Sequence, residues 1–114
     1  MSLEPSTRRV NQRHSVNIPS VIHLKGGTRE AFITNISVGG LYIKDTFAYE
    51  NKQVISVEFS IPNLNSPIMV DSIVRWLERV DEEIIGVGVQ FVGLKAKEVW
   101  ALTRYFATLQ SQEM

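Results

Sequence analysis

The chain has no cysteine among its 114 residues and only two histidines, His14 and His23. Without thiols the protein cannot form disulfides, use a thiolate nucleophile or bind zinc through cysteine. Neither histidine stands at a recognisable metal-ligand spacing with carboxylates, and no nucleophile-elbow glycines surround any serine. The sequence therefore predicts a protein that is not an enzyme and holds no metal or cofactor.

Long apolar runs are also missing. No run approaches the roughly 18 residues that span a bilayer, and the N-terminal segment MSLEPSTRR lacks the apolar core of a secretory signal. We therefore expect a cytoplasmic protein without membrane insertion. The glycosylation-like motif NIS at residues 35–37 carries little weight without such a signal.

Net charge is the third absence. The formal net charge is +0, so no overall field attracts nucleic acid or an anionic membrane. The charges are unevenly spread, however. The first 29 residues contain one acidic residue, Glu4, and five basic ones: Arg8, Arg9, Arg13, Lys25 and Arg29. This distribution indicates a local anion site more than a general polyanion-binding surface.

The apolar residues that are present make up 44% of the chain and fall into six short segments: 16–24, 30–36, 41–45, 54–61, 68–80 and 84–92. Pro19 in the first segment indicates an edge strand or a β-bulge. Alternation predicts strands with one apolar face each. In the last three segments these faces carry Ile55, Val57, Phe59 and Ile61; Ile68, Val70, Val74 and Trp76; and Ile85, Val87, Val89 and Phe91.

The periodicity changes only at the end of the chain. Residues 95–110 place Val99, Leu102, Phe106 and Leu109 at helical spacing, which predicts an amphipathic helix. No βαβ repeat is present, so a parallel nucleotide-binding sheet is excluded. The expected fold class is all-β, an antiparallel barrel or sandwich with one C-terminal helix over residues 15–110. Residues 1–14 are polar and aperiodic and are predicted to be a flexible arm.

Two polar segments are candidates for binding. Arginine offers a planar, permanently charged fork that grips phosphate or the guanine edge, so the segment RRVNQR at residues 8–13 is either a solvated tail or part of an anion site. The segment NISVGG at residues 35–40 is either a hairpin turn or a ligand contact in which glycines let the backbone approach closely. The segment GVGVQF at residues 86–91 lacks the third glycine of a dinucleotide loop, and its glycines are expected to relieve crowding in a curved strand.

These two segments occur in the order and form of a known pair of motifs. Residues 9–13 read RxxxR and residues 35–40 read [D/N]xSxxG, with a strand, a turn and a strand between them. The chain thereby resembles the PilZ domain, the bacterial receptor module for cyclic di-GMP. The segments IVRWLE and IGVGVQFVGL also resemble the last two strands of that family, so the similarity extends over residues 8–109.

The resemblance implies a six-stranded antiparallel split barrel with a C-terminal helix, and it implies site residues. In the family the two arginines of RxxxR grip the guanine and phosphates of the ligand, which implies that role for Arg9 and Arg13. The second motif lines the barrel beneath the ligand, which implies contacts from Asn35 and Ser37. Gly39 and Gly40 complete the implied site. Asn35 stands where many members have aspartate, which changes the hydrogen bonds available to guanine.

An extra arginine directly before RxxxR tends, in this family, to accompany binding of a stacked pair of ligand molecules, and we extend that role to Arg8. The expected function is a non-enzymatic cyclic di-GMP sensor. Its N-terminal arginine arm closes over the ligand and alters a contact with an unidentified protein partner in trans.

Two rival functions remain open. The first is a small barrel that binds single-stranded nucleic acid, which needs a basic groove with exposed aromatic side chains. The neutral net charge and the core-facing phase of Phe59, Trp76 and Phe91 count against this function. The second is a PilZ-like adaptor that contacts proteins without binding a ligand, against which the intact motifs argue.

Overall fold

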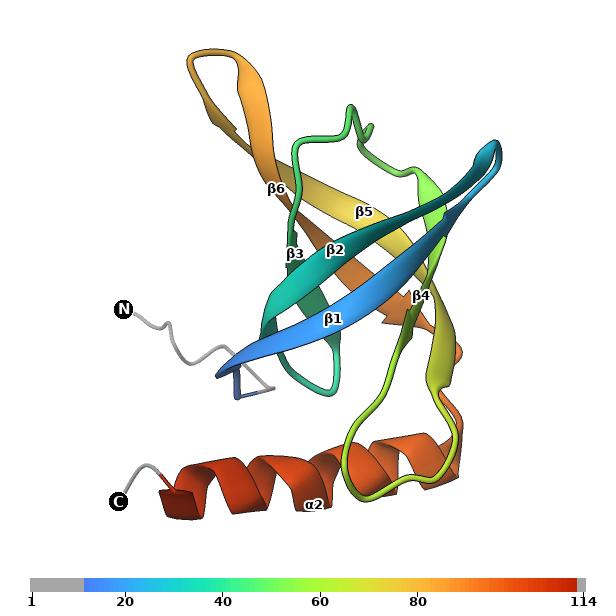
Figure 1. Cartoon of the computed structure of the whole chain (residues 1–114), viewed down its shortest axis with the longest axis vertical. Helices are drawn as coiled ribbons and strands as arrows, with labels where there is room; N and C mark the ends of the chain where they lie inside the picture. Colours follow the sequence, from blue (N-terminus) through green and yellow to red (C-terminus); the bar gives the residue numbers. More distant parts are fainter. Residues whose placement is uncertain (1–11, 113–114) are drawn as a thin grey trace, which may run out of the picture.

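A computed structural model describes residues 12–112 of the chain and shows six β-strands followed by one α-helix. The strands form one closed antiparallel barrel, and the helix α2 lies across one of its ends (Figure 1). The elements are β1 (His14–Leu24), β2 (Gly27–Ile36), β3 (Gly40–Lys44), β4 (Val54–Phe59), β5 (Ile68–Val80), β6 (Glu83–Val92) and α2 (Ala96–Gln112). This confirms the predicted fold class.

The strands follow the order β1-β2-β3-β6-β5-β4, and β4 pairs back onto β1 to close the barrel. Closure removes the exposed sheet edge that an open sheet of this size leaves. Pairing of β1 with β4 begins at Ser20, directly after Pro19, and β1 carries a bulge between Ser15 and Ile18. Pro19 thus lies beside a bulge and at the end of the doubly paired stretch, in agreement with the prediction that it marks an edge or a bulge.

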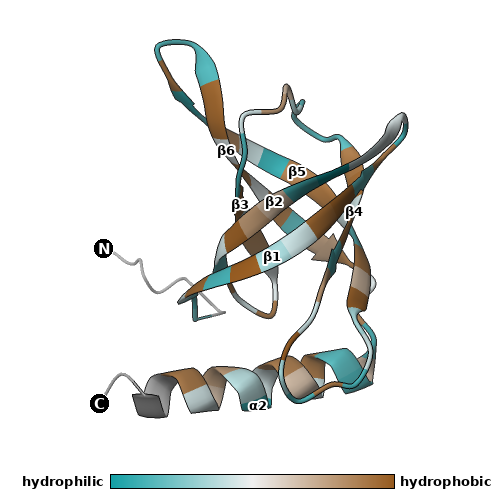
Figure 2. Cartoon of the chain, viewed as in Figure 1, coloured by the Kyte–Doolittle hydropathy of each residue, from teal (hydrophilic) through white to brown (hydrophobic). Residues whose placement is uncertain are grey.

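The barrel core follows the alternation of the sequence, and Figure 2 shows hydrophobic and hydrophilic residues alternating along the strands. One side chain after another on the inner face is completely buried, including Ile22, Ile33, Ile43, Val57, Val74 and Val87. Fully burying an aliphatic side chain of this size stabilises a fold by roughly 1.5–3 kcal/mol. Strand-to-strand packing of branched residues therefore supplies most of the core.

Helix α2 covers the end of the barrel at which the β2–β3 turn lies, and the β1–β2 and β5–β6 hairpins project from the other end (Figure 1). Its inner face buries Ala101, Leu102 and Phe106. The Glu98 carboxylate accepts a hydrogen bond from the Lys95 backbone N–H at 3.0 Å, which caps the first turn. Val99, predicted to share the apolar face, is 38% exposed because the buried stripe begins at Glu98 and Ala101 instead.

Trp76 corrects a second expectation. The alternation of 68–80 places it in phase with Ile68, Val70 and Val74, yet its side chain is 42% exposed. The register of β5 against β6 shifts between Val74 and Trp76. A bulge of this kind adds one residue to a strand and reverses the facing of every residue beyond it. The indole therefore lies on the outer surface.

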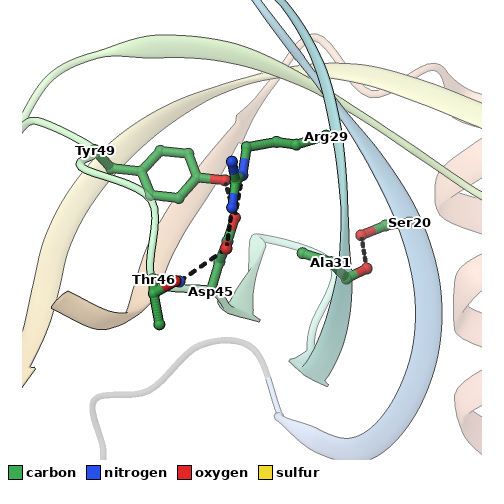
Figure 3. Close-up of polar contacts among 6 residues, drawn as sticks. All are labelled: Ser20, Arg29, Ala31, Asp45, Thr46 and Tyr49. Carbon is green, nitrogen blue, oxygen red and sulfur yellow. Dashed lines mark hydrogen bonds and ion pairs between the residues drawn. The ribbon is translucent and has the colours of Figure 1, made fainter.

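At the end of the barrel away from α2, a polar network holds the loop between β3 and β4 (Figure 3). The Arg29 guanidinium donates two hydrogen bonds of 2.8 Å to the Asp45 carboxylate, and the Tyr49 hydroxyl donates a third of 2.8 Å. Burial opposes ionisation of Asp45, but the bonds from Arg29 and Tyr49 hold the pKa of Asp45 below its ordinary value. The network anchors the loop at its first residue.

Candidate functional site

An open cavity of about 400 Å³ lies on the outer surface of the barrel, a size typical of small-molecule sites. The β2–β3 turn and the strands β3, β5 and β6 enclose it. Five of the seven residues that the sequence predicted for the site line it: Arg13, Asn35, Ser37, Gly39 and Gly40. The remaining two, Arg8 and Arg9, lie outside the described residues. The structure thus brings the end of RxxxR and the NISVGG segment to one place.

The NISVGG segment is a tight turn between β2 and β3. The Ser37 backbone N–H donates to the Gly40 carbonyl at 2.9 Å, and the Ser37 hydroxyl accepts from the Gly39 N–H at 3.1 Å. The Gly39 carbonyl in turn accepts from the Phe91 N–H at 2.9 Å, which fastens the turn to β6. The turn and ligand interpretations of this segment are therefore compatible, because the bonds that hold the turn also fix one wall of the cavity.

Gly40 has a packing role of its own. A Cβ at this position would meet the backbone of β6, where the Gln90 Cα and the Val89 carbonyl carbon both lie 3.2 Å away. Gly40 pairs with Gln90 in the ladder, so neither strand can move aside without losing hydrogen bonds. Only glycine allows β3 and β6 to approach this closely.

Arg13 is exposed and directly precedes β1. Its neighbour His14 is only 6% exposed, and the His14 ring stacks on the Phe106 ring of α2 with centroids 4.4 Å apart. This stack fixes the point at which the chain enters the barrel. The position of the Arg13 backbone at the cavity is therefore set by packing against α2.

Two aromatic side chains that sequence reasoning missed also line the cavity. Tyr42 of β3 and Trp76 of β5 lie with ring centroids 5.5 Å apart and planes at 39°. Both rest on β6, where a Cβ on Gly88 would lie 2.7 Å from Cε2 of Trp76 and one on Gly86 would lie 2.8 Å from Cε1 of Tyr42. These two glycines leave room on the outer face of β6 for the two rings, which are tilted relative to each other.

A further pair that the sequence did not single out is Arg75 of β5 and Gln90 of β6. The Arg75 Nε donates to the Gln90 Oε1 at 2.6 Å, and both residues line the cavity. The bulge beside Trp76 places Arg75 and Trp76 on the same outer surface although they are consecutive. The sequence feature that relates to this half of the cavity is the spacing of Gly86 and Gly88. Two glycines two residues apart leave one face of a strand without side chains.

A model of the family described as PilZ domain matches residues 7–108 of the chain. The chain belongs to the PilZ domain family. No curated protein matches it in sequence.

Solved structures share the fold of this PilZ domain. The inhibitor of motility MotI/DgrA of Bacillus subtilis superimposes with a TM-score of 0.80 at 18% identity, over 94% of this chain and 53% of that one. The PilZ domain of YcgR from Escherichia coli with c-di-GMP superimposes with a TM-score of 0.74 at 14% identity, over 93% of this chain and 94% of that one. The MrkH–c-di-GMP complex of K. pneumonia superimposes with a TM-score of 0.73 at 14% identity, over 93% of this chain and 54% of that one. The chain thus spans about half the length of MotI and MrkH.

The electrostatics of the cavity in this PilZ domain favour an anion. Among the described residues that line it, two are arginines and none is acidic. Glu78, just beyond the cavity, accepts a hydrogen bond from the Tyr42 hydroxyl. Burial, assisted by that bond, raises the pKa of Tyr42 to about 12, so the phenol stays neutral and serves as a donor.

Two further findings concern residues 12–112. This part of the chain has no group of three histidine, aspartate or glutamate side chains that could hold a metal ion. It also contains no helix with the length and apolar character needed to cross a membrane.

Proposed function

We propose that this PilZ domain is a non-enzymatic cytoplasmic receptor for cyclic di-GMP that binds in the cavity beside the NISVGG turn. Arg9 and Arg13 grip the guanine and phosphates, and Asn35 and Ser37 contact the ligand from the barrel wall. Arg8 extends the arginine arm and admits a second, stacked ligand molecule. The arm closes over the ligand and changes the surface that a protein partner recognises in trans.

One observation carries this proposal. Arg13 and Asn35 are far apart in the sequence, yet both line one cavity, with Ser37, Gly39 and Gly40 beside them. The β1–β2 ladder pairs His14 with Ile36 and Ser15 with Asn35, so the hairpin itself brings Arg13 beside the turn. A permanently charged guanidinium and the polar turn residues thereby border one cavity, in which a single anionic ligand can contact both.

The charges of the cavity match those of the ligand class. A cyclic dinucleotide carries two phosphate charges and two purine edges, and arginine pairs with both through bidentate hydrogen bonds. Each charge-assisted hydrogen bond contributes about 1.5–3 kcal/mol. Such bonds offset the cost of fixing the arm, about 1–2 kcal/mol for each residue that is ordered.

The relatives support the same ligand. The structures of the YcgR PilZ domain and of MrkH were solved with c-di-GMP, and both share the fold of this chain over 93% of its length.

A route from the ligand to a protein contact passes through His14. It follows Arg13 directly and stacks on Phe106, so movement of the arm acts on α2. The outer face of α2 presents Trp100, which is 61% exposed and lies under the Arg104 guanidinium at 5.0 Å. An exposed tryptophan beside an arginine has the composition of an interface anchor, and we assign the partner contact to this face.

Calorimetric titration with cyclic di-GMP tests the proposal. Arg13→Ala is expected to weaken binding about 10- to 150-fold, the loss of one charge-assisted contact. Arg79→Ala is the matched control, because Arg79 is an exposed arginine of β5 that does not line the cavity. Absence of binding heat from the wild type at micromolar ligand would refute the receptor and favour the adaptor. A stoichiometry near two that falls to one in Arg8→Ala supports the stacked pair.

The single-stranded nucleic-acid function needs its own measurement. Phe59 and Phe91 are buried and count against it, but Trp76 is exposed and does not. An arbitrary oligonucleotide is therefore titrated at rising salt concentration. Tight binding that falls steeply with salt favours the nucleic-acid function, whereas weak binding beside tight cyclic di-GMP binding favours the receptor.

A further inference from the structure

The outer face of β6 beside the NISVGG turn carries a second group of cavity residues with a shared geometry. Gly86 and Gly88 have no side chains, and the rings of Tyr42 and Trp76 occupy the space that their Cβ atoms would take. The Trp76 indole is 42% exposed, so one side of it packs on the glycine strand and another faces the cavity. The result is a pair of aromatic rings, tilted by 39°, next to the proposed phosphate contacts.

The Arg75 guanidinium lies in the same cavity and is oriented by Gln90. The bond from Arg75 Nε to Gln90 Oε1 at 2.6 Å is the one hydrogen bond that the described residues give Arg75. Its amino groups remain available as a donor fork. Arginine uses this fork to donate to O6 and N7 of guanine, and the two acceptors match its geometry.

We infer that Trp76, with Tyr42 packed beside it, stacks on one purine base of the ligand and that Arg75, held by Gln90, reads its edge as guanine. The inference rests on the proposed function and adds four residues to it. Stacking on an aromatic surface accepts any base, since every base has a π face. Discrimination therefore falls to Arg75, because adenine presents an amino donor where guanine presents O6.

The bulge in β5 is what makes the subsite. With regular alternation Arg75 and Trp76 would lie on opposite faces of the sheet, and only one of them could reach the ligand. The register shift between Val74 and Trp76 turns both to the outer surface. Gly88 of β6 then leaves room for the Trp76 indole on the face that also carries Arg75. The bulge in β5 interrupts the regular ladder, and the glycines weaken β6. Features that weaken a strand in this way indicate a role beyond packing.

Tryptophan fluorescence tests the stacking half. The chain has two tryptophans, and Trp100 lies on α2 away from the cavity, so Trp100→Phe leaves Trp76 as the only reporter. Cyclic di-GMP is expected to quench the Trp76 emission of Trp100→Phe with the affinity found by calorimetry, and Trp76→Phe then reports only what the ligand does to α2. Trp76→Ala is expected to weaken binding about 5- to 150-fold, which corresponds to 1–3 kcal/mol at 1.4 kcal/mol per tenfold change.

Gly88→Ala provides a second test that keeps the indole. The added Cβ displaces the ring from β6, so affinity is expected to fall although Trp76 is present. Thermal unfolding of each variant establishes that the barrel is intact. Calorimetric binding by Trp100→Phe without any change in Trp76 emission overturns the stacking role, as does unchanged affinity in Trp76→Ala.

Competition between cyclic di-GMP and cyclic di-AMP tests the reading of guanine. Arg75→Ala is expected to reduce the preference for cyclic di-GMP about 5- to 150-fold, and Arg75→Lys to restore little of it because lysine lacks the fork. Arg79→Ala is expected to leave the ratio unchanged. An unchanged ratio in Arg75→Ala overturns this inference while the receptor stands. Failure of the wild type to bind cyclic di-GMP overturns both.

Discussion

Replacing Asp45 by asparagine is expected to destabilise the barrel by about 2–3 kcal/mol without changing the ligand cavity. The Asp45 carboxylate accepts from Nε and Nη2 of Arg29, from the Tyr49 hydroxyl and from the Thr46 N–H, each at 2.8 Å. An asparagine keeps one acceptor oxygen and turns an amino donor toward the remaining donors. It therefore loses the bonds from Arg29 Nε and the Tyr49 hydroxyl.

The magnitude follows from the burial of the partners. Tyr49 is only 2% exposed, so its hydroxyl loses a buried acceptor, at a cost of about 1–3 kcal/mol. The lost charge-assisted bond from Arg29 adds about 1.5–3 kcal/mol. The Arg29 side chain is 33% exposed and water compensates part of its loss, which brings the sum to about 2–3 kcal/mol. For a domain of this size the melting temperature falls by roughly 8–12 °C.

The pH dependence gives this prediction a sharper form. The pKa of Asp45 in the folded protein lies below its ordinary value of 3.8, so its ionised form contributes stability above that value. That stability is lost as the pH falls through the lowered folded pKa. The difference in unfolding free energy between wild type and Asp45→Asn is therefore constant from neutral pH down to about the ordinary pKa of 3.8. Below that pH the difference becomes smaller.

Urea denaturation at a series of pH values measures both effects. Asp71→Asn is the matched control, because Asp71 is an exposed aspartate that accepts one bond from the Ser56 hydroxyl. The control is expected to change stability by about 0.5 kcal/mol or less. A melting temperature of Asp45→Asn within about 2 °C of wild type, or a difference that persists unchanged in strong acid, would contradict the stabilising role of the Asp45 carboxylate.

Three further outcomes are expected. Gly40→Ala destabilises the barrel by about 1–3 kcal/mol in urea denaturation because its Cβ meets the β6 backbone, whereas Gly26→Ala, with open space around the Cβ, stays close to wild type. Glu82→Gly raises the melting temperature by about 2–4 °C, since Glu82 has φ 70° in the β5–β6 turn; a decrease contradicts this. His14→Ala weakens the protection that cyclic di-GMP gives α2 in hydrogen exchange, and protection equal to wild type argues against the His14–Phe106 route.

Much of the candidate site could be predicted from the sequence because its parts are local motifs. The NISVGG turn is closed by hydrogen bonds within four consecutive residues, so its form depends little on the rest of the fold. Arg13, the last residue of the RxxxR motif, lines the cavity together with the turn. The roles of Arg8, Arg9 and Arg13 as ligand contacts remain predictions.

The other half of the cavity could not be predicted, because its residues belong to three strands that are distant in sequence. Tyr42, Trp76 and Gly88 meet only because β3 and β5 both pair with β6. Trp76 was assigned to the core from its phase, which holds only while the strand is regular. A single inserted residue between Val74 and Trp76 reversed that phase, and no periodicity in the sequence marks it.

The six strands, the final helix and the turn at Ser37 follow from local patterns in the amino-acid sequence. Each of these depends on periodicity or on bonds between near neighbours. Three features arise only when the barrel folds: Trp76 and Arg75 both face outward, aromatic rings pack against Gly86 and Gly88, and the β2–β3 turn borders the same cavity. These features depend on strand register and on pairing between distant segments, and their free energy is set by contacts that form only when the barrel closes.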